Sequence, residues 1–199
     1  MTARHHQMIA EFTTTFGHPL HDTPTRPGPK LQKLRIRLLR EEFNEFTAAV
    51  MAEDYTEVAD GLGDMAVIAH GTLHAYGLPY APRSVAGPSN LHTAYLRYLD
   101  AEKAAAANPS VAALKPIAYE LNQLLVDIRH TAAQLRIPFG RVFEEIHASN
   151  MSKLGPDGRP IYRADGKIAK GPNYRPPNLV DILFDAGLPV KVTATAAAA

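Results

Sequence analysis

Residues 41–64 read EEFNEFTAAVMAEDYTEVADGLGD, and this stretch decides the fold because it joins two predicted helices that both carry carboxylates. Within each helix the acids recur at a spacing of three or four residues, which places them along one edge. The acids are Glu41, Glu42 and Glu45 in the first helix, and Glu57, Asp60 and Asp64 in the second. Like charges at this spacing repel, and no Lys or Arg follows four residues after any of them. Hard divalent cations such as Mg²⁺ or Mn²⁺ take oxygen ligands, so two facing acidic helices predict a metal site.

A salt-bridged or solvated acidic helix face is the alternative interpretation. The helix macrodipole favours acids near a helix N-terminus, which would account for Glu57 and Asp60. It does not account for Asp64, which lies in the apolar run Leu-Gly-Asp-Met-Ala-Val-Ile. A lone carboxylate on a largely buried helix is costly unless it is paired or binds a metal. Spacing alone leaves both interpretations open.

Composition limits the class of protein. The chain has 199 residues, 46% of them hydrophobic, which is enough for one domain with a sizeable core. The net charge of +1 argues against a stable nucleic-acid partner. The absence of cysteine excludes disulfides, thiolate zinc sites and cysteine nucleophiles. No apolar run reaches the length of about 18 residues that a membrane span needs, so we expect a soluble cytoplasmic protein.

Apolar residues at helical spacing predict an all-α fold, and no alternating strand pattern of useful length is present. The fold we expect is a bundle of five or six helices. The predicted helices cover residues 5–16, 30–51, 56–76, 91–107, 111–135 and 139–150.

Beyond residue 150 the chain changes character. Residues 151–178 are rich in Pro, Gly and Lys and predict an irregular, ordered tail rather than a helix. We therefore expect a single domain over residues 1–178 that includes this tail. Residues 179–199 form a short extension, whose end has too little to bury and is expected to fray.

Two histidines on the second acidic helix raise a different metal hypothesis. His70 and His74 are one turn apart and would form half of a zinc site. No third soft ligand lies at a supporting spacing, and the carboxylate cluster prefers a harder ion. A zinc site is therefore disfavoured.

Two sequence motifs resemble one known superfamily. The Glu-Glu-x-x-Glu element, followed by a Gly-Asp that opens an apolar helix, is similar to the MazG-like and phosphoribosyl-ATP pyrophosphohydrolase-like all-α nucleotide pyrophosphatases. The segment His147-Ala-Ser-Asn-Met-Ser-Lys153 and the later Lys170-Gly-Pro-Asn-Tyr174 resemble the C-terminal signature of the phage-type branch. The likeness covers roughly residues 5–76 and 136–178. That branch includes the (d)GTP-cleaving MazZ-like group.

The resemblance implies hydrolysis of a nucleoside triphosphate between the α and β phosphates, with Mg²⁺ or Mn²⁺ as cofactor. It implies Glu42, Glu45 and Asp64 as metal ligands, and Glu41 as a further ligand or as the base that orients water. Many family members carry Glu three residues before the Asp that matches Asp64, and this chain has Gly61 there. Asp60 or Glu57 is then the candidate for the missing carboxylate.

The resemblance also implies a tail that clamps the substrate. The lysines suit phosphate oxygens, Asn150 offers a donor and an acceptor, and Tyr174 offers a ring for stacking. The expected substrate-binding residues are Asn150, Lys153, Lys167, Lys170 and Tyr174. Purine substrates, (d)GTP first, and a role in nucleotide-pool control follow from the likeness to the phage-type enzymes. Family members assemble as dimers or as tetramers built from dimers, so a homo-oligomer is expected.

Three other functions stay open at this point. One is a house-cleaning hydrolase of several or modified dNTPs. Another is a non-catalytic nucleotide-binding homologue, for which the Gly61 departure is the best support. The last is a helical interaction module with an acidic surface.

Overall fold

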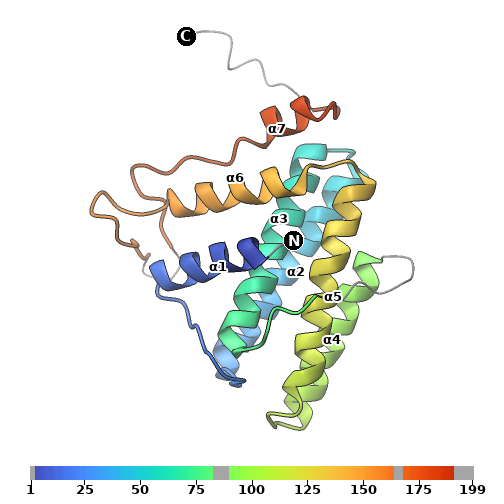
Figure 1. Cartoon of the computed structure of the whole chain (residues 1–199), viewed down its shortest axis with the longest axis vertical. Helices are drawn as coiled ribbons and strands as arrows, with labels where there is room; N and C mark the ends of the chain where they lie inside the picture. Colours follow the sequence, from blue (N-terminus) through green and yellow to red (C-terminus); the bar gives the residue numbers. More distant parts are fainter. Residues whose placement is uncertain (1–2, 83–89, 164–167, 191–199) are drawn as a thin grey trace.

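The computed structural model describes residues 3–82, 90–163 and 168–190, and its regular elements over these residues are seven α-helices (Figure 1). Their bounds are α1 Ala3–Thr15, α2 Pro29–Met51, α3 Tyr55–Tyr76, α4 Leu91–Ala107, α5 Leu114–Gln134, α6 Phe139–Met151 and α7 Leu179–Asp185.

The two acidic helices form a hairpin, because only three residues separate α2 from α3. Asp54 caps the start of α3, where its carboxylate accepts hydrogen bonds from the backbone amides of Thr56 at 3.1 Å and Glu57 at 3.2 Å. Gly77 ends α3 in the left-handed region, with φ at 61°. A Cβ at this glycine would lie 1.9 Å from the carbonyl oxygen of Thr23, so the connector before α2 also requires glycine here.

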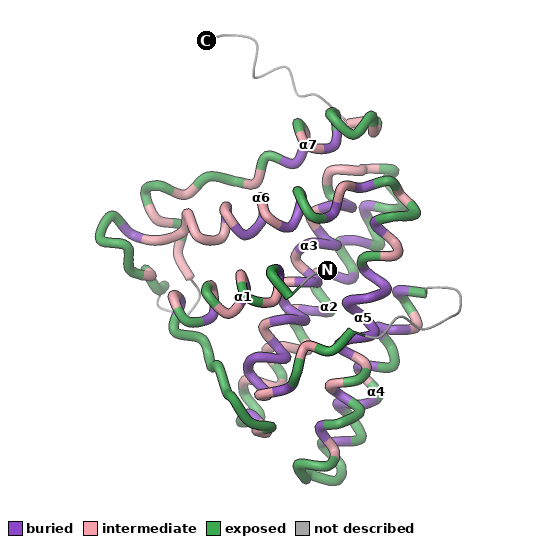
Figure 2. Tube along the Cα trace, viewed as in Figure 1, coloured by how far each residue is buried: buried purple, intermediate pink, exposed green. Residues whose placement is uncertain are grey.

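The core is centred on α3, which is buried along most of its length (Figure 2). Five helices pack against it: α1, α2, α5, α6 and α7. Its fully buried apolar side chains include Leu62, Met65, Ala66, Ala69 and Leu73. A helix that is apolar around most of its circumference has to lie inside a bundle, and this position holds the acidic end of α3 between its neighbours.

The remaining helices form two further layers. Helices α4 and α5 pair with each other, and α5 also packs against α3. Helices α1 and α6 lie side by side across the other flank of α3 (Figure 1). The short α7 packs on α3 and α6 through the buried side chains of Leu179 and Leu183.

The predicted all-α fold is confirmed, and six helices lie within a few residues of their predicted ranges. Helix α5 starts at Leu114 rather than at residue 111, because Ser110 caps the turn that precedes it, where its hydroxyl accepts from the amide of Ala113 at 3.2 Å. The seventh helix, α7, was not predicted. It has seven residues, so its formation depends on tertiary packing more than on periodicity.

Within the described residues, no helix is long and apolar enough to cross a membrane.

Candidate functional site

The acidic residues of α2 and α3 meet where the two helices approach each other closely. A Cβ at Gly61 of α3 would lie 3.0 Å from the Cβ of Phe46 on α2, so glycine allows the backbones to come together. Gly61 itself is buried against α2, whereas its neighbour Asp60 is only partly buried. Position 61 therefore faces a helix contact, and Asp60 is the residue that can present a carboxylate.

The pKa of Glu42 shows how closely the acids of the two helices act on each other. Burial, and to a lesser extent the nearby charges of Asp64, Glu45, Asp60 and Glu41, together raise the pKa of this half-buried carboxyl to about 8. Glu42 lies on α2 and Asp64 on α3, so the electrostatic cluster spans the helix pair.

The two aspartates of α3 respond in the same way. Burial, together with repulsion from Asp60 and Glu45, raises the pKa of Asp64 to about 7. Burial, together with repulsion from Glu57 and Glu45, raises the pKa of Asp60 to about 6. Perturbed carboxyls gathered in this way are typical of functional sites.

Two predicted members of the cluster lie at its edge. Glu45 is exposed, although its charge acts on all three raised carboxyls. Glu41 is also exposed, and its Oε1 lies 3.7 Å from Nε of Arg37 one turn earlier on α2. A surface pair at this distance contributes little to stability, so Glu41 can reorient at low cost.

The carboxylates do not converge on one point as they stand. Across the described ranges, no three His, Asp or Glu side chains are arranged so that they could hold a metal ion. The donors are nevertheless all carboxylate oxygens, which is the set that Mg²⁺ and Mn²⁺ prefer. Their chemistry fits a hard divalent ion, and binding one would require side-chain rearrangement.

The end of α6 reaches the acidic cluster because α6 packs tightly on α3. A Cβ at Gly63 would lie 2.1 Å from Cδ1 of Ile146, so the residue before Asp64 is where the two helices touch. Asn150 and Lys153 follow Ile146 by four and seven residues, which puts all three near one face of the helix end. The charge of Lys153 lowers the pKa of both Asp60 and Asp64, against the raising effect of burial.

Lys153 is also held by its own helix end. Its Nζ donates a hydrogen bond to Oδ1 of Asn150 at 2.6 Å. The two residues predicted to contact substrate are therefore in contact with each other and lie beside the predicted metal ligands.

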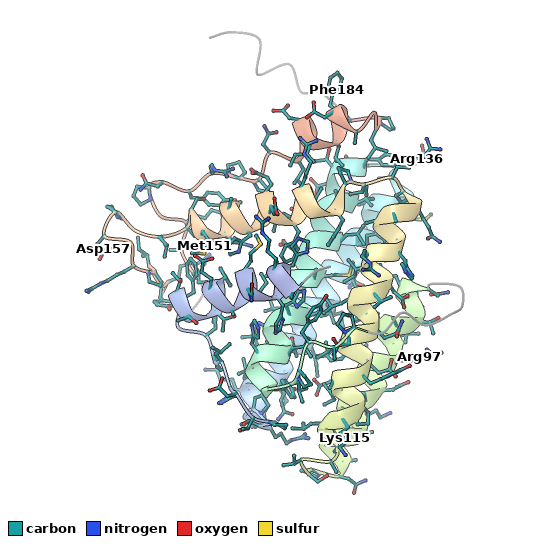
Figure 3. The ribbon with its side chains drawn as sticks, viewed as in Figure 1. Arg97, Lys115, Arg136, Met151, Asp157 and Phe184 are labelled. Atoms are coloured by element: carbon teal, nitrogen blue, oxygen red, sulfur yellow. The ribbon has the colours of Figure 1, made fainter. Side chains whose placement is uncertain are left out.

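The other predicted substrate residues lie in the tail after α6, which leaves the helix near Met151 and swings outward past Asp157 (Figure 3). Nζ of Lys170 lies 4.4 Å from the ring centroid of Tyr174, a cation–π contact. The amide of Gly171 donates to the carbonyl of Lys153 at 3.3 Å, which ties this part of the tail to the end of α6. Lys167, also predicted to bind substrate, lies outside the described residues.

A polar strap that sequence patterns did not reveal holds the tail on α6. The guanidinium of Arg175 pairs with the Glu145 carboxylate. Ser149 Oγ donates to the carbonyl of Arg175 at 2.9 Å, and the Arg175 amide donates to Ser152 Oγ at 3.0 Å. Glu145 and Ser149 of α6 and its C-cap residue Ser152 are spaced by four and three residues, so they lie along one face, which is the one signal that could have indicated them.

Comparisons with known proteins agree with this geometry. Residues 9–84 match the model of the phosphoribosyl-ATP pyrophosphohydrolase family, PRA-PH, and this region contains every acid of the cluster. The chain is 26% identical to uncharacterized protein L479 of Acanthamoeba polyphaga mimivirus, in an alignment that covers 76% of this chain and 72% of the viral protein. A solved structure of a proposed NTP pyrophosphohydrolase from Exiguobacterium sp. 255-15 superposes with a TM-score of 0.59 at 23% identity, covering 91% of this chain and 94% of the other.

The family match over residues 9–84 confirms the resemblance to the MazG-like and phosphoribosyl-ATP pyrophosphohydrolase-like superfamily. The solved structure shows that the fold is shared. Assignment to the phage-type branch stays a prediction.

Proposed function

We propose that this chain is a metal-dependent nucleoside triphosphate pyrophosphohydrolase that cleaves (d)NTP between the α and β phosphates to (d)NMP and pyrophosphate. The observation that carries the proposal is the cluster of Glu42, Asp60 and Asp64 where α2 and α3 meet, with the pKa of each carboxyl raised by burial and by its acidic neighbours. The family match over the same residues and the shared fold support it.

We assign the metal to four carboxylates: Glu42, Glu45, Asp60 and Asp64. These oxygens repel each other without a counter-charge, and a bound Mg²⁺ or Mn²⁺ would relieve that repulsion. Bound there, the ion would neutralise phosphate oxygens and lower the pKa of a coordinated water. Asp60 takes the place of the family glutamate missing at Gly61, because Asp60 acts on both Glu42 and Asp64 while position 61 faces Phe46.

The base that orients the water is proposed to be Glu41. Its carboxylate lies beside the cluster and adds to the charge that raises the pKa of Glu42. Its weak pair with Arg37 leaves it free to turn toward a water at the edge of the site.

The end of α6 and its tail are proposed to hold the triphosphate. Lys153 already lies close enough to Asp60 and Asp64 to lower their pKa values, so its ammonium is placed to meet phosphate oxygens bound at the same acids. Asn150 positions Lys153 through their hydrogen bond. Lys170 and Tyr174 provide a second cation and a ring from the tail, and Lys167 is assigned the same role by its motif.

Purine nucleotides, (d)GTP first, are the proposed substrates, and control of the nucleotide pool is the proposed role. This preference comes from the likeness to phage-type enzymes rather than from a base-reading contact. A house-cleaning activity on several or modified dNTPs is the alternative that a substrate panel would reveal.

A second copy of this chain is the proposed partner, as a dimer or as a tetramer built from dimers. Val50 and Met51 at the C-terminal end of α2 are 44% and 82% exposed. They adjoin a hollow of about 310 Å³ lined by Val50, Glu53, Tyr55, Val58 and Leu135. Exposed apolar groups of this kind favour association. Light scattering that gave the mass of a single chain, 21.7 kDa, would contradict the proposal.

A non-catalytic nucleotide-binding homologue is the second candidate. It is favoured by the departure at Gly61 and by the lack of three convergent metal ligands among the described side chains. It predicts thermal stabilisation by nucleotides without turnover.

The test is a panel of the common NTPs and dNTPs with Mg²⁺ or Mn²⁺, with products separated by chromatography. We expect monophosphate and pyrophosphate, abolished by a chelator and ranked by base. Asp100→Asn, which removes an exposed acid on α4, is the matched control and should retain full activity. Nucleotide-dependent stabilisation without any product would favour the non-catalytic homologue, and neither stabilisation nor product would favour an interaction module.

A further inference from the structure

Three histidines from two helices, none of them a member of the acidic cluster, form a row of ring contacts. His6 of α1 lies between His70 and His74 of α3. The Nδ1 atoms of His6 and His70 are 2.9 Å apart, and the Nε2 atoms of His6 and His74 are 3.0 Å apart. Nδ1 of His74 in turn lies 3.5 Å from Oγ1 of Thr13, which returns the chain to α1. His6 uses a different nitrogen for each neighbour, so the three rings are joined in series.

Spacing along α3 could not reveal this arrangement, because His6 is 64 residues from His70 in the sequence. The structure supplies a third imidazole beside the pair that suggested half a zinc site. The three histidines do not form a metal site, because no three His, Asp or Glu side chains among the described residues are placed to hold a metal ion. The rings are instead suited to bonding with each other.

A neutral imidazole has one N–H donor and one bare nitrogen acceptor. In a series of neutral rings, each can donate on one side and accept on the other, so both N···N contacts are hydrogen bonds. If His6 took up one additional proton, both of its nitrogens would donate, and His70 and His74 could each accept. If His70 or His74 were then protonated as well, an N–H group would face another N–H group across the contact with His6. The two contacts therefore hold with one proton on each ring or with one additional proton on His6, and one of them fails once His70 or His74 is protonated as well.

Burial favours this neutral state. It lowers the pKa of His70 well below its ordinary value, that of His74 to about 4, and that of His6 in the same direction. The fully buried His70 and the nearly buried His74 lie in the core of the bundle.

The groups around the rings add to the effect. The charge of Arg35 on α2 acts on His74, and those of His5 and the amino terminus act on His70, all against protonation. The ring of Tyr80 stacks on that of His6, with 5.0 Å between the ring centroids. The charge of Arg129 on α5 acts on the Tyr80 phenol and lowers its pKa, against the raising effect of burial. Phe143 of α6 packs edge-on against His70. Glu144, also on α6, raises the pKa of His5, which is not one of the three histidines joined in series.

We propose that the His6, His70 and His74 chain is an acid-released latch that holds α1 on α3. The sign follows from linkage. A histidine disfavoured as a cation when docked takes up its proton when α1 leaves, so the latch is closed above the ordinary histidine pKa of about 6.5 and opens as pH falls below it.

Release of α1 would affect the acidic cluster indirectly, because α1 also contacts α6. Arg4 of α1 pairs with Glu144 at 3.1 Å, and Glu11 lies 3.5 Å from Nε2 of His147, both on α6. Asn150 lies in the last turn of the same α6, and it holds Lys153, which follows the helix end and acts on the aspartates of α3. An opened latch removes one of the supports of α6, so acid would loosen that helix before the α4–α5 pair.

The experiment is hydrogen exchange with mass spectrometry on the full chain, at about pH 7.5 and about pH 5, where histidine changes charge. Protection factors corrected for intrinsic exchange are compared for peptides of α1 and of α5. We expect α1 to lose protection by roughly tenfold or more at the lower pH, with α5 nearly unchanged, and to regain it on return to neutral pH.

His6→Gln is the test variant, because an amide keeps one donor and one acceptor but cannot become charged. The His6→Gln variant should lose less α1 protection at acid pH than the parent does. The control His130→Gln changes a histidine of α5 that is not one of the three, and it should behave as the parent. The latch is refuted if α1 protection does not change between the two pH values, if α5 opens together with α1, or if the parent and His6→Gln respond equally. Histidine ring resonances followed by NMR give a second readout, and titration of His70 or His74 near pH 6.5 in the folded protein refutes it too.

Discussion

At the scale of single residues, Glu42 differs from an ordinary surface glutamate in what surrounds it. It is half-buried, and four other carboxyls act on it, so its pKa rises to about 8. A folded chain that has to hold such a group in its charged form loses stability relative to the unfolded chain, in which the group ionises freely.

We therefore predict that Glu42→Gln stabilises the metal-free protein. The gain in thermal midpoint should grow as pH rises towards about 8, because Glu42 of the unfolded parent ionises from about pH 4.5 whereas the folded parent keeps this proton until about pH 8. The same variant should bind Mg²⁺ more weakly, measured by calorimetry. Asp100→Asn is the control, and equal Mg²⁺ affinity in Glu42→Gln and the parent would remove Glu42 from the ligand set.

Lys153 is the cation that lowers the pKa of both aspartates of α3. We predict that Lys153→Met raises KM for nucleotide by roughly tenfold or more, because a hydrogen bond to a charged group contributes about 1.5–3 kcal/mol. Lys153→Arg should recover part of the loss, since it restores the charge. Steady-state kinetics measure both, and an unchanged KM in Lys153→Met would mean that its ammonium does not meet the substrate.

At the scale of elements, the helix periodicity of the sequence was sufficient to predict the six longer helices. The acids could be assigned to one edge within α2 and within α3, since residues three or four apart share a face. Their meeting across the hairpin follows from the short turn that Asp54 caps. The site is thus predictable as far as local spacing determines it.

The contributions of α1, α6 and the tail were not predictable in this way. Lys153 reaches the aspartates because Gly63 admits Ile146, a contact between residues 83 positions apart that periodicity cannot specify. The strap between Arg175 and Glu145 and the approach of His6 to His70 are also long-range contacts. Packing decides them, and packing depends on the whole chain.

The strap leads to a prediction for the tail as an element. Arg175→Met removes the ion pair with Glu145 but leaves the backbone contacts with Ser149 and Ser152. We expect KM for nucleotide to rise several-fold while kcat and the thermal midpoint change little, because an exposed pair contributes about 0–1 kcal/mol to stability. Arg163→Met, another exposed arginine of the tail, is the comparison variant. A collapse of kcat in Arg175→Met would instead place the strap in the chemical step.

At the scale of the whole molecule, two clusters on α3 give opposite pH dependences. The raised carboxyl pKa values of Glu42, Asp60 and Asp64 mean that their contribution to stability is greatest at acid pH and is lost as pH rises to about 8. The lowered histidine pKa values mean that their contribution is complete above about pH 6.5 and is lost as pH falls towards the folded value, about 4 for His74.

We predict that the metal-free protein is most stable between these two limits. Mg²⁺ should raise the thermal midpoint mainly on the alkaline side, where the carboxylates are charged, and should leave the acid side unchanged. Thermal unfolding across pH, with chelator and with Mg²⁺, measures both effects. A uniform effect of Mg²⁺ at every pH would contradict binding at the acidic cluster.

The most direct test of the account is nucleotide hydrolysis in heavy-oxygen water with Mg²⁺, comparing the parent with Asp64→Asn. The account predicts that the monophosphate carries one heavy oxygen, that pyrophosphate carries none, and that the variant loses activity by roughly a hundredfold or more while staying folded. Label in pyrophosphate or in orthophosphate, or equal turnover by Asp64→Asn, would contradict water attack at the α-phosphate directed by this cluster.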